Sequence, residues 1–136
     1  MREVAAALLF DRDGKFLIYL RDDKSEIPFP NHWDLFGGHV EAGETPQFAL
    51  IRELEEELRV TPIKLEFFKS YECTVGDVYP NRKYIYLGRL AERATELTLY
   101  EGQELRGIDI QDFKDYRFAN ILDQIIADYL PEHLGV

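Results

Sequence analysis

The chain of 136 residues contains one cysteine, Cys73. A single cysteine excludes an intrachain disulfide and a cysteine-based zinc cage, and it fits a reducing compartment. No stretch approaches the roughly 18 apolar residues of a membrane-spanning helix. A charged turn follows the first apolar run, where a signal peptide would have its small-residue cleavage site. We therefore expect a soluble, cytoplasmic protein in which Cys73 is buried as an apolar residue.

Basic residues are also scarce, with 16 Lys and Arg against 26 Asp and Glu and a net charge of −10. Nucleic acids and anionic membrane surfaces both require a basic surface, so we expect neither as a partner. The negative charge is uneven, because six Glu and one Arg lie between positions 41 and 57. Such a concentration of like charge must be solvated or neutralised by a bound cation.

The chain has enough apolar surface for one core, since 46% of its residues are hydrophobic, with nine Phe and eight Tyr. Its length is close to the commonest size of a single domain. We find no internal repeat and no stretch with the composition of a linker. The sequence therefore predicts one domain over residues 1–136.

Short apolar runs bounded by turn residues predict strands at 3–10, 16–20, 33–36, 63–75 and 83–90. The turn signal at 11–14 joins the first two into a hairpin, and a turn at 76–81 separates the last two. Two prolines make 21–32 a loop, and residues 120–130 have the pattern of an amphipathic helix. Strands, helix, strands and helix in this order predict an α/β domain with a mixed sheet covered by helices on two faces.

The period changes to that of a helix after Thr45, which suits an N-cap, and Pro46, which suits the first helical position. Apolar residues then recur at helical spacing: Phe48, Ile51, Leu54 and Leu58. Thr61 and Pro62 are expected to end this helix.

Three carboxylates of this helix, those of Glu53, Glu56 and Glu57, fall on one stripe beside its apolar face at about 100° per residue. Glu55 falls elsewhere. Like charges at these spacings destabilise a helix by roughly 0.2–0.5 kcal/mol per pair, and Mg²⁺ bound through carboxylates would compensate. For an arbitrary Glu-rich helix, the alternative is a solvated face balanced by Arg52. The preceding segment 37–44 contains three glycines, so we expect a loop whose backbone can approach a ligand closely.

Gly38, Glu44 and the run Arg52-Glu-Leu-Glu-Glu-Glu-Leu-Arg-Val60 have the spacing G-x5-E-x7-R-E-U-x-E-E-x-G-U, where U is a bulky aliphatic residue. In this respect the chain resembles the Nudix hydrolase family and is MutT-like. All polar positions of this Nudix box match, and the one departure is Arg59 in place of Gly. A Gly there would adopt a left-handed cap conformation, which costs another residue about 1 kcal/mol unless the helix ends in another way.

The resemblance implies a Nudix-type α/β/α sandwich with a mixed central sheet. It also implies a nucleotide pyrophosphohydrolase, in which water attacks phosphorus in a nucleoside diphosphate derivative with Mg²⁺ or Mn²⁺ as cofactor. Arg52 and Glu44 would hold the metal ligands in place. Which of the three helix glutamates acts as the base varies within the family and stays open. The implied metal ligands are three carboxylates and two backbone positions: Glu53, Glu56, Glu57, Gly37 and Gly38.

Two short matches beyond the box are similar to the MutT-type branch, which acts on nucleoside triphosphates. Glu101, in Glu-Gly-Gln, would be a further metal ligand or base, and Asn120, after Ala119, would contact the nucleobase. The alternatives are an exposed loop carboxylate for Glu101 and a simple helix N-cap for Asn120. These matches favour a nucleoside triphosphate as the small-molecule substrate, whereas the segment 27–41 also suits enzymes that take sugar nucleotides.

Other candidate substrate contacts come from the loop region. Phe29 and Trp33 flank it and could stack on a base, Arg21 could contact phosphate, and His39 could touch the substrate. The resemblance is also compatible with a homodimer, because family members are often dimers. The competing interpretation, based on Arg59, is a non-catalytic Nudix-like module that binds a nucleotide or a protein.

Overall fold

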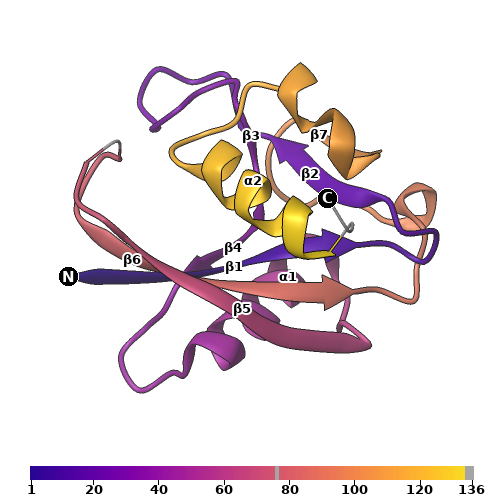
Figure 1. Cartoon of the computed structure of the whole chain (residues 1–136), viewed down its shortest axis with the longest axis horizontal. Helices are drawn as coiled ribbons and strands as arrows, with labels where there is room; N and C mark the ends of the chain where they lie inside the picture. The colour runs from indigo at the N-terminus through magenta and orange to yellow at the C-terminus, as the bar shows by residue number, and fades with distance from the viewer. Residues whose placement is uncertain (76, 134–136) are drawn as a thin grey trace.

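A mixed sheet lies between two helices (Figure 1). The computed structural model describes residues 1–75 and 77–133. The mixed sheet between two helices confirms the predicted α/β fold class. In chain order the elements are β1 (Arg2–Phe10), β2 (Phe16–Leu20), β3 (Trp33–Asp34), β4 (Phe36–His39), α1 (Pro46–Leu58), β5 (Lys64–Cys73), β6 (Asn81–Arg89), the 3-10 helix η1 (Ala94–Glu96), β7 (Glu104–Ile108), the 3-10 helix η2 (Ile110–Asp115) and α2 (Leu122–His133).

The central strand β1 has two successive partners along one edge. Its residues Val4–Ala7 pair with β4, and its residues Leu9 and Phe10 pair with β2. On its other edge β1 runs parallel to β6, which pairs antiparallel with β5. Strand β2 also pairs with β3 and β7. The sheet therefore divides along the edge of β1 that pairs with β2 and β4, with β2, β3 and β7 on one side and β4 on the other. The cavity described below is lined from both sides of that division.

The predicted hairpin at the N-terminus is confirmed. β1 and β2 pair antiparallel with Leu9 opposite Leu17. The side chain of Asp11 stabilises the connecting turn, because its Oδ1 accepts the backbone N–H groups of Asp13 and Lys15, each at 2.9 Å.

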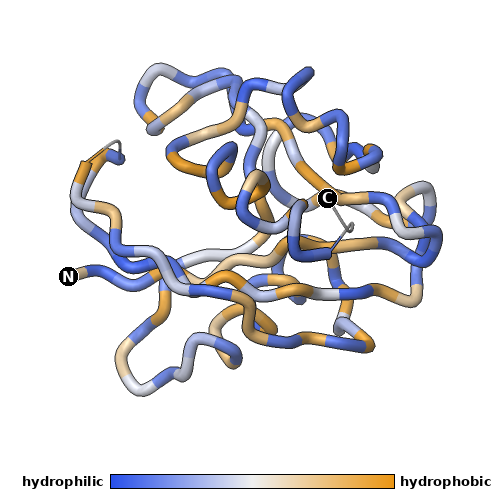
Figure 2. Tube along the Cα trace, viewed as in Figure 1, coloured by the Kyte–Doolittle hydropathy of each residue, from blue (hydrophilic) through white to orange (hydrophobic). Residues whose placement is uncertain are grey.

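Each face of the sheet has its own hydrophobic core, because successive residues of a strand point to opposite faces. Ala5 and Leu9 of β1 pack with Leu50 and Leu54 of α1, whereas Leu8 packs on the α2 side with residues such as Ile125. Figure 2 shows hydrophobic residues gathered between α2 and the sheet, and hydrophilic residues along most outer turns. Cys73 is buried, as predicted.

Helix α1 begins at Pro46 and ends at Leu58, in agreement with the sequence prediction. Thr45 Oγ1 accepts the N–H of Phe48 at 3.1 Å, which caps the first turn. Arg59 adopts the left-handed conformation (φ 57°, ψ 39°), and its N–H donates to Glu55 O at 3.0 Å. The cap at Arg59 turns the chain, so the helix ends within a few residues of the predicted stop at Thr61 and Pro62.

Arg59 occupies the position where the Nudix box has Gly. A contact with Tyr100, which is distant in the sequence, offsets the cost of its left-handed conformation. The guanidinium carbon of Arg59 lies 4.7 Å from the ring centroid of Tyr100. A cation–π contact of this kind contributes about 0.5–1 kcal/mol at an exposed site, which is comparable to the cost of the left-handed conformation.

One expectation about local structure is wrong, and two features were not anticipated. Gly37 and Gly38 lie in β4 instead of a loop, paired with Ala6 and Ala5 of β1. A Cβ at Gly37 would lie 2.2 Å from Ala5 O, so only Gly permits this close pairing. Strand β7 was not expected, because its alternation is weak and its pairing with β2 defines it. Phe48 is 61% exposed, although it recurs at the helical spacing of the buried Leu54 and Leu58.

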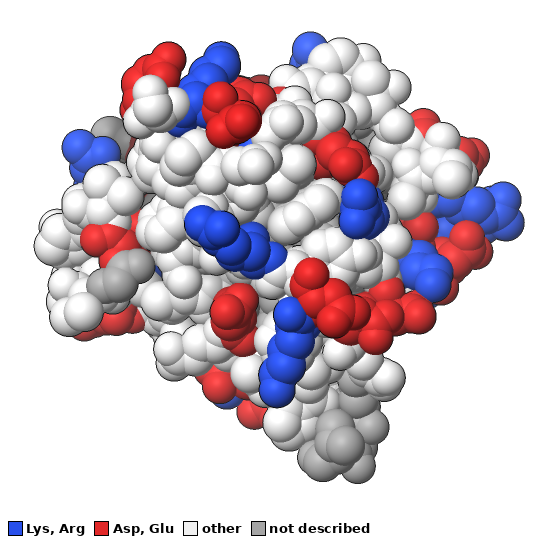
Figure 3. All heavy atoms as spheres, turned by 90° about the horizontal axis from the view of Figure 1, so that it is seen from above, with Lys and Arg blue, Asp and Glu red and all other residues white. Residues whose placement is uncertain are grey.

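Strands β5 and β6 confirm the predicted strands to within a few residues, while position 76 of the predicted turn lies outside the described residues. No helix in the described part of the chain is long and apolar enough to cross a membrane. On the face shown in Figure 3, acidic and basic side chains lie interspersed.

Candidate active site

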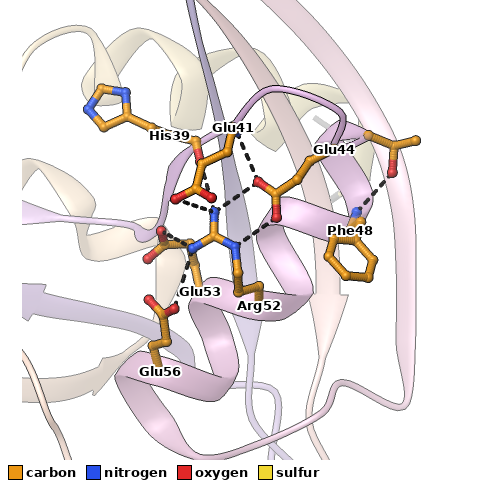
Figure 4. A network of polar contacts seen from close by, with 8 residues as sticks. His39, Glu41, Glu44, Phe48, Arg52, Glu53 and Glu56 are labelled. Atoms are coloured by element: carbon orange, nitrogen blue, oxygen red, sulfur yellow. Dashed lines mark hydrogen bonds and ion pairs between the residues drawn. The ribbon is translucent and has the colours of Figure 1, made fainter.

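Arg52 joins helix α1 to the segment before it (Figure 4). Its Nε and one terminal nitrogen donate to the two carboxylate oxygens of Glu44, at 2.8 and 3.0 Å. The second of these nitrogens also donates to His39 O at 3.1 Å. Glu44 in turn accepts the N–H of Glu41 at 2.9 Å, and its bonds to Arg52 lower its pKa below the ordinary value. This bidentate pair fixes the chain between β4 and α1.

Arg52 also orients the first two carboxylates of the box. Its other terminal nitrogen donates to Glu53 Oε1 at 3.0 Å and to Glu56 Oε1 at 3.4 Å. Burial raises the pKa of Glu53, as does the nearby Glu56 carboxylate, while Arg52 opposes both. Glu53 lies directly over Gly38, because a Cβ at Gly38 would be 2.4 Å from its carboxyl carbon. Gly38 therefore provides the space that the Glu53 carboxylate occupies.

Glu57 is the buried member of the cluster, with only 3% of its surface exposed. Its Oε1 accepts the N–H of Gly37 at 3.0 Å, and its Oε2 is buried without a hydrogen-bond partner among the described residues. Burial is the main cause that raises the pKa of Glu57 to about 11, and the neighbouring carboxyls of Glu101 and Glu53 add to it. The backbone N–H of Tyr100 donates to Glu57 O at 2.9 Å, so the segment carrying Glu101 is tied to α1.

This arrangement fits a divalent cation. A buried carboxylate oxygen without a donor, beside two more carboxyls that disfavour its ionisation, lacks a positive partner. The donors are all oxygen, which is the set that Mg²⁺ prefers. Within residues 1–75 and 77–133, no three acidic, His or Cys side chains already surround one point. Since Mg²⁺ usually retains several waters, Glu53 and Glu57 with backbone oxygens are a sufficient set.

A cavity of about 330 Å³ lies where the sheet divides. Its lining includes most of the residues that sequence reasoning assigned to substrate or to the metal: Arg21, Phe29, Gly37, Gly38, His39, Glu101 and Asn120. The structure thus brings together the glycines of β4, the loop carboxylate Glu101 and four candidate substrate contacts, although they come from five separate parts of the chain.

The comparisons with known proteins agree with this geometry. Residues 1–129 match the family model described as the NUDIX domain. The chain belongs to the Nudix family. The CTP pyrophosphohydrolase of Escherichia coli (strain K12) is 39% identical over 76 residues, which cover 56% of this chain and 54% of that protein. The 8-oxo-dGTP diphosphatase of Haemophilus influenzae is 36% identical over 70 residues, which cover 52% of this chain and 50% of that protein.

The matched segment therefore spans about half the length of these two curated relatives. Among solved structures, the MutT protein from Methanosarcina mazei Go1 superposes with a TM-score of 0.80. It is 18% identical, and the match covers 99% of this chain and 96% of that one. This likeness confirms the Nudix α/β fold over nearly the whole chain.

Arg21 and His39 are held by neighbours at the Nudix cavity. Arg21 pairs with Asp34 at 2.9 Å, and its Nε donates to Pro28 O at 2.9 Å. Partial burial raises the pKa of Asp34, while the charge of Arg21 lowers it. The Nε2 of His39 lies 3.1 Å from the hydroxyl of Tyr79. Arg21 is therefore a fixed donor whose charge is already balanced.

The other candidate substrate contacts differ in position. Phe29 lines the Nudix cavity with a positive φ of 49°. Asn120 lines it too, and its Oδ1 accepts the N–H of Ile121 at 2.9 Å, just before α2 begins. Trp33 is not among the described residues that line the cavity; its ring packs edge-on against Tyr116, with centroids 5.5 Å apart.

Sequence reasoning missed a second polar group at this Nudix site. Asp77, Asn81 and Lys83 also line the cavity. A charged residue two positions before a buried Ile85 in one strand was a usable signal, because both side chains point to the same face. Lysines are almost never buried unless they are paired, so a lysine in a strand is expected at the surface and Lys83 was not considered.

Arg52→Lys is expected to lower the metal-dependent rate of this Nudix domain by about 10- to 100-fold, the usual effect of removing a contact that orients metal ligands. Lysine cannot form the bidentate pair with Glu44 while also donating to Glu53. The rate should be measured over a range of Mg²⁺ concentrations beside Arg93→Lys, which changes a surface arginine paired with Asp13. Equal rates for both variants would contradict the orienting role of Arg52.

Proposed function

We propose that this chain is a Mg²⁺-dependent nucleotide pyrophosphohydrolase that cleaves the diphosphate linkage of a nucleoside triphosphate or a sugar nucleotide by water attack on phosphorus. The observation that carries the proposal is the buried Glu57, with its unpartnered oxygen, beside Glu53 and Glu101, the last of which lines the cavity. The names of the relatives, a CTP pyrophosphohydrolase and an 8-oxo-dGTP diphosphatase, support it. We also propose that residues 1–136 form a single Nudix domain, since the family model covers 1–129.

The residues proposed to hold the metal are the box carboxylates together with the backbone of β4 and the loop carboxylate: Glu53, Glu56, Glu57, Gly37, Gly38 and Glu101. When bound, Mg²⁺ or Mn²⁺ would neutralise the phosphate oxygens and the leaving group. Glu56 is the most exposed of the three helix carboxylates Glu53, Glu56 and Glu57, with 56% of its side chain exposed, so it would contact the metal from the solvent side.

The side chains of the protein hold the metal ligands in place and contact the substrate. Arg52 and Glu44 fix the angle of α1 against the preceding segment, so Glu53 keeps its place over Gly38. A carboxylate of the cluster would accept the proton of the attacking water, and which of them does so stays open. Arg21, Phe29, His39 and Asn120 would contact the substrate in the cavity. Trp33 is left out of this set because it packs against Tyr116.

A substrate panel tests the proposed function. Purified protein with Mg²⁺ or Mn²⁺ is incubated with nucleoside triphosphates, sugar nucleotides, ADP-ribose and dinucleotides, and the products are separated by ion-exchange chromatography. We expect a nucleoside monophosphate from at least one substrate, and none when EDTA is added. Stabilisation of the protein by these compounds without turnover would support the non-catalytic binding module instead.

A further inference from the structure

Three polar side chains at the cavity have no part in the proposed metal chemistry: Asp77, Asn81 and Lys83. Lys83 lies on β6 opposite Val4 of β1, and its side chain is only 8% exposed. Its Nζ donates to Asp77 Oδ2 at 2.8 Å. An ammonium group has three N–H donors, and Asp77 is the one hydrogen-bond partner that the described residues give it. Lys83 therefore has donors to spare at the cavity.

Asn81, in contrast, has a hydrogen-bond acceptor that lacks a donor. Its Nδ2 donates to Asp77 Oδ2 at 2.9 Å and to Tyr79 O at 3.0 Å. Because both partners are acceptors, the orientation of the amide is fixed. Its Oδ1 is buried and has no hydrogen-bond partner among the described residues, although the side chain lines the cavity. A buried acceptor of this kind needs a donor, which a ligand in the cavity can supply.

The charges of the cavity favour a neutral group over a phosphate at this position. The basic side chains in its lining are Arg21 and Lys83, and each is paired with a carboxylate, Asp34 or Asp77, at 2.9 and 2.8 Å. The lining also includes apolar side chains, which suit a flat ring. These wall residues are Val4, Ala6, Leu35, Ile85 and Leu122.

We propose that Lys83 and Asn81 read the edge of a nucleobase and select bases with a carbonyl next to a ring N–H, the lactam edge of guanine, hypoxanthine, uracil and thymine. Lys83 donates to the carbonyl oxygen, and Asn81 Oδ1 accepts the ring N–H. Adenine and cytosine present the reverse pattern, an amino donor toward Lys83 and a bare ring nitrogen toward Asn81 Oδ1. This inference rests on the proposed function, which places the nucleoside in this cavity.

Calorimetric titration without metal tests the selection, using two pairs of matched ring size, GMP with AMP and UMP with CMP. We expect GMP and UMP each to bind at least about tenfold more tightly than their partners, as for one well-formed pair of base contacts. Lys83→Met should reduce this ratio to about threefold or less, while the matched surface variant Lys64→Met should leave it unchanged. Lys64 is 68% exposed on β5.

Equal binding within both pairs, a preference for AMP and CMP, or no binding of any monophosphate would overturn the inference. The ratio in the unaltered protein decides this even if Lys83→Met fails to fold, which a thermal melt reveals. Because the titration needs no turnover, the two proposals fail separately. Lactam preference without hydrolysis of any substrate would refute the proposed enzyme alone, whereas hydrolysis without lactam preference would refute this base selection alone.

Discussion

Glu57→Gln is expected to lower the Mg²⁺-dependent rate by more than about a hundredfold and to stabilise the metal-free protein. The rate falls because a ligand is lost, which costs more than the 10- to 100-fold typical of a supporting residue. Stability rises because Gln requires no proton to be buried. Its Oε1 can still accept the N–H of Gly37, and its amide can donate to Glu101.

The gain in stability has a defined pH dependence. The pKa of Glu57 is about 11 in the folded protein, against an ordinary value of 4.5. Between these values the folded state holds a proton that the unfolded state releases, so the free energy of unfolding decreases as pH rises above 4.5. The largest slope that one such group gives is about 1.4 kcal/mol per pH unit. Glu57→Gln lacks this slope.

Urea unfolding with EDTA, at several values between about pH 5 and about pH 8, measures this difference. The free energies of unfolding of the two proteins should diverge as pH rises, with the variant the more stable. Glu55→Gln is the matched control, because Glu55 is exposed on the same helix and should follow the unaltered protein. Parallel curves for Glu57→Gln and the unaltered protein would show that Glu57 is not buried as described.

Gly38→Ala should retain the fold and lose most of the metal-dependent rate, by about a hundredfold or more. The new Cβ would lie 2.4 Å from the carboxyl carbon of Glu53. Since that contact is with the end of a flexible side chain, the carboxylate moves while the backbone stays. Measurement of kcat/KM against Mg²⁺ concentration, together with Tm, separates the two effects. A variant with the full rate would show that the Glu53 carboxylate does not need its place over Gly38.

Gly37→Ala is the matched comparison, one residue away, and it should mainly lower stability. Its Cβ would lie 2.2 Å from Ala5 O and 2.6 Å from Ala6 Cα, both backbone atoms of β1, and its φ is +149°. Neither the strand nor the backbone conformation can adjust cheaply, so we expect a loss of about 3 kcal/mol or more. Similar Tm values for the two alanine variants would contradict this division of roles.

Local patterns were sufficient for the parts of the fold that depend on neighbouring residues. Helical spacing after Thr45 predicted α1, and its geometry placed Glu57 next to the apolar face, where the structure buries it. The hairpin followed from the turn at 11–14 for the same reason. The spacing of the Nudix box identified the family, which the domain match confirms.

Features that depend on distant partners were not predictable. Strand β7 is defined by its pairing with β2, and the glycines of β4 by their close approach to β1. Lys83 and Asp77 form a buried ion pair that the spacing of residues in the sequence does not predict. The cap at Arg59 is compensated by Tyr100, far along the chain. In each case the deciding contact joins segments whose proximity only the folded sheet establishes.

We expect Glu57 to release its proton to the solvent when a divalent cation binds in the glutamate cluster, because the cation stabilises the ionised carboxylate. Calorimetric titration of the metal-free protein with Mg²⁺ at about pH 7, in buffers of different ionisation enthalpy, counts the protons released on binding. We expect about one proton per bound ion for the unaltered protein, and much weaker binding without this proton for Glu57→Gln. Equal Mg²⁺ binding by both proteins, or binding without proton release by the unaltered one, would contradict the claim.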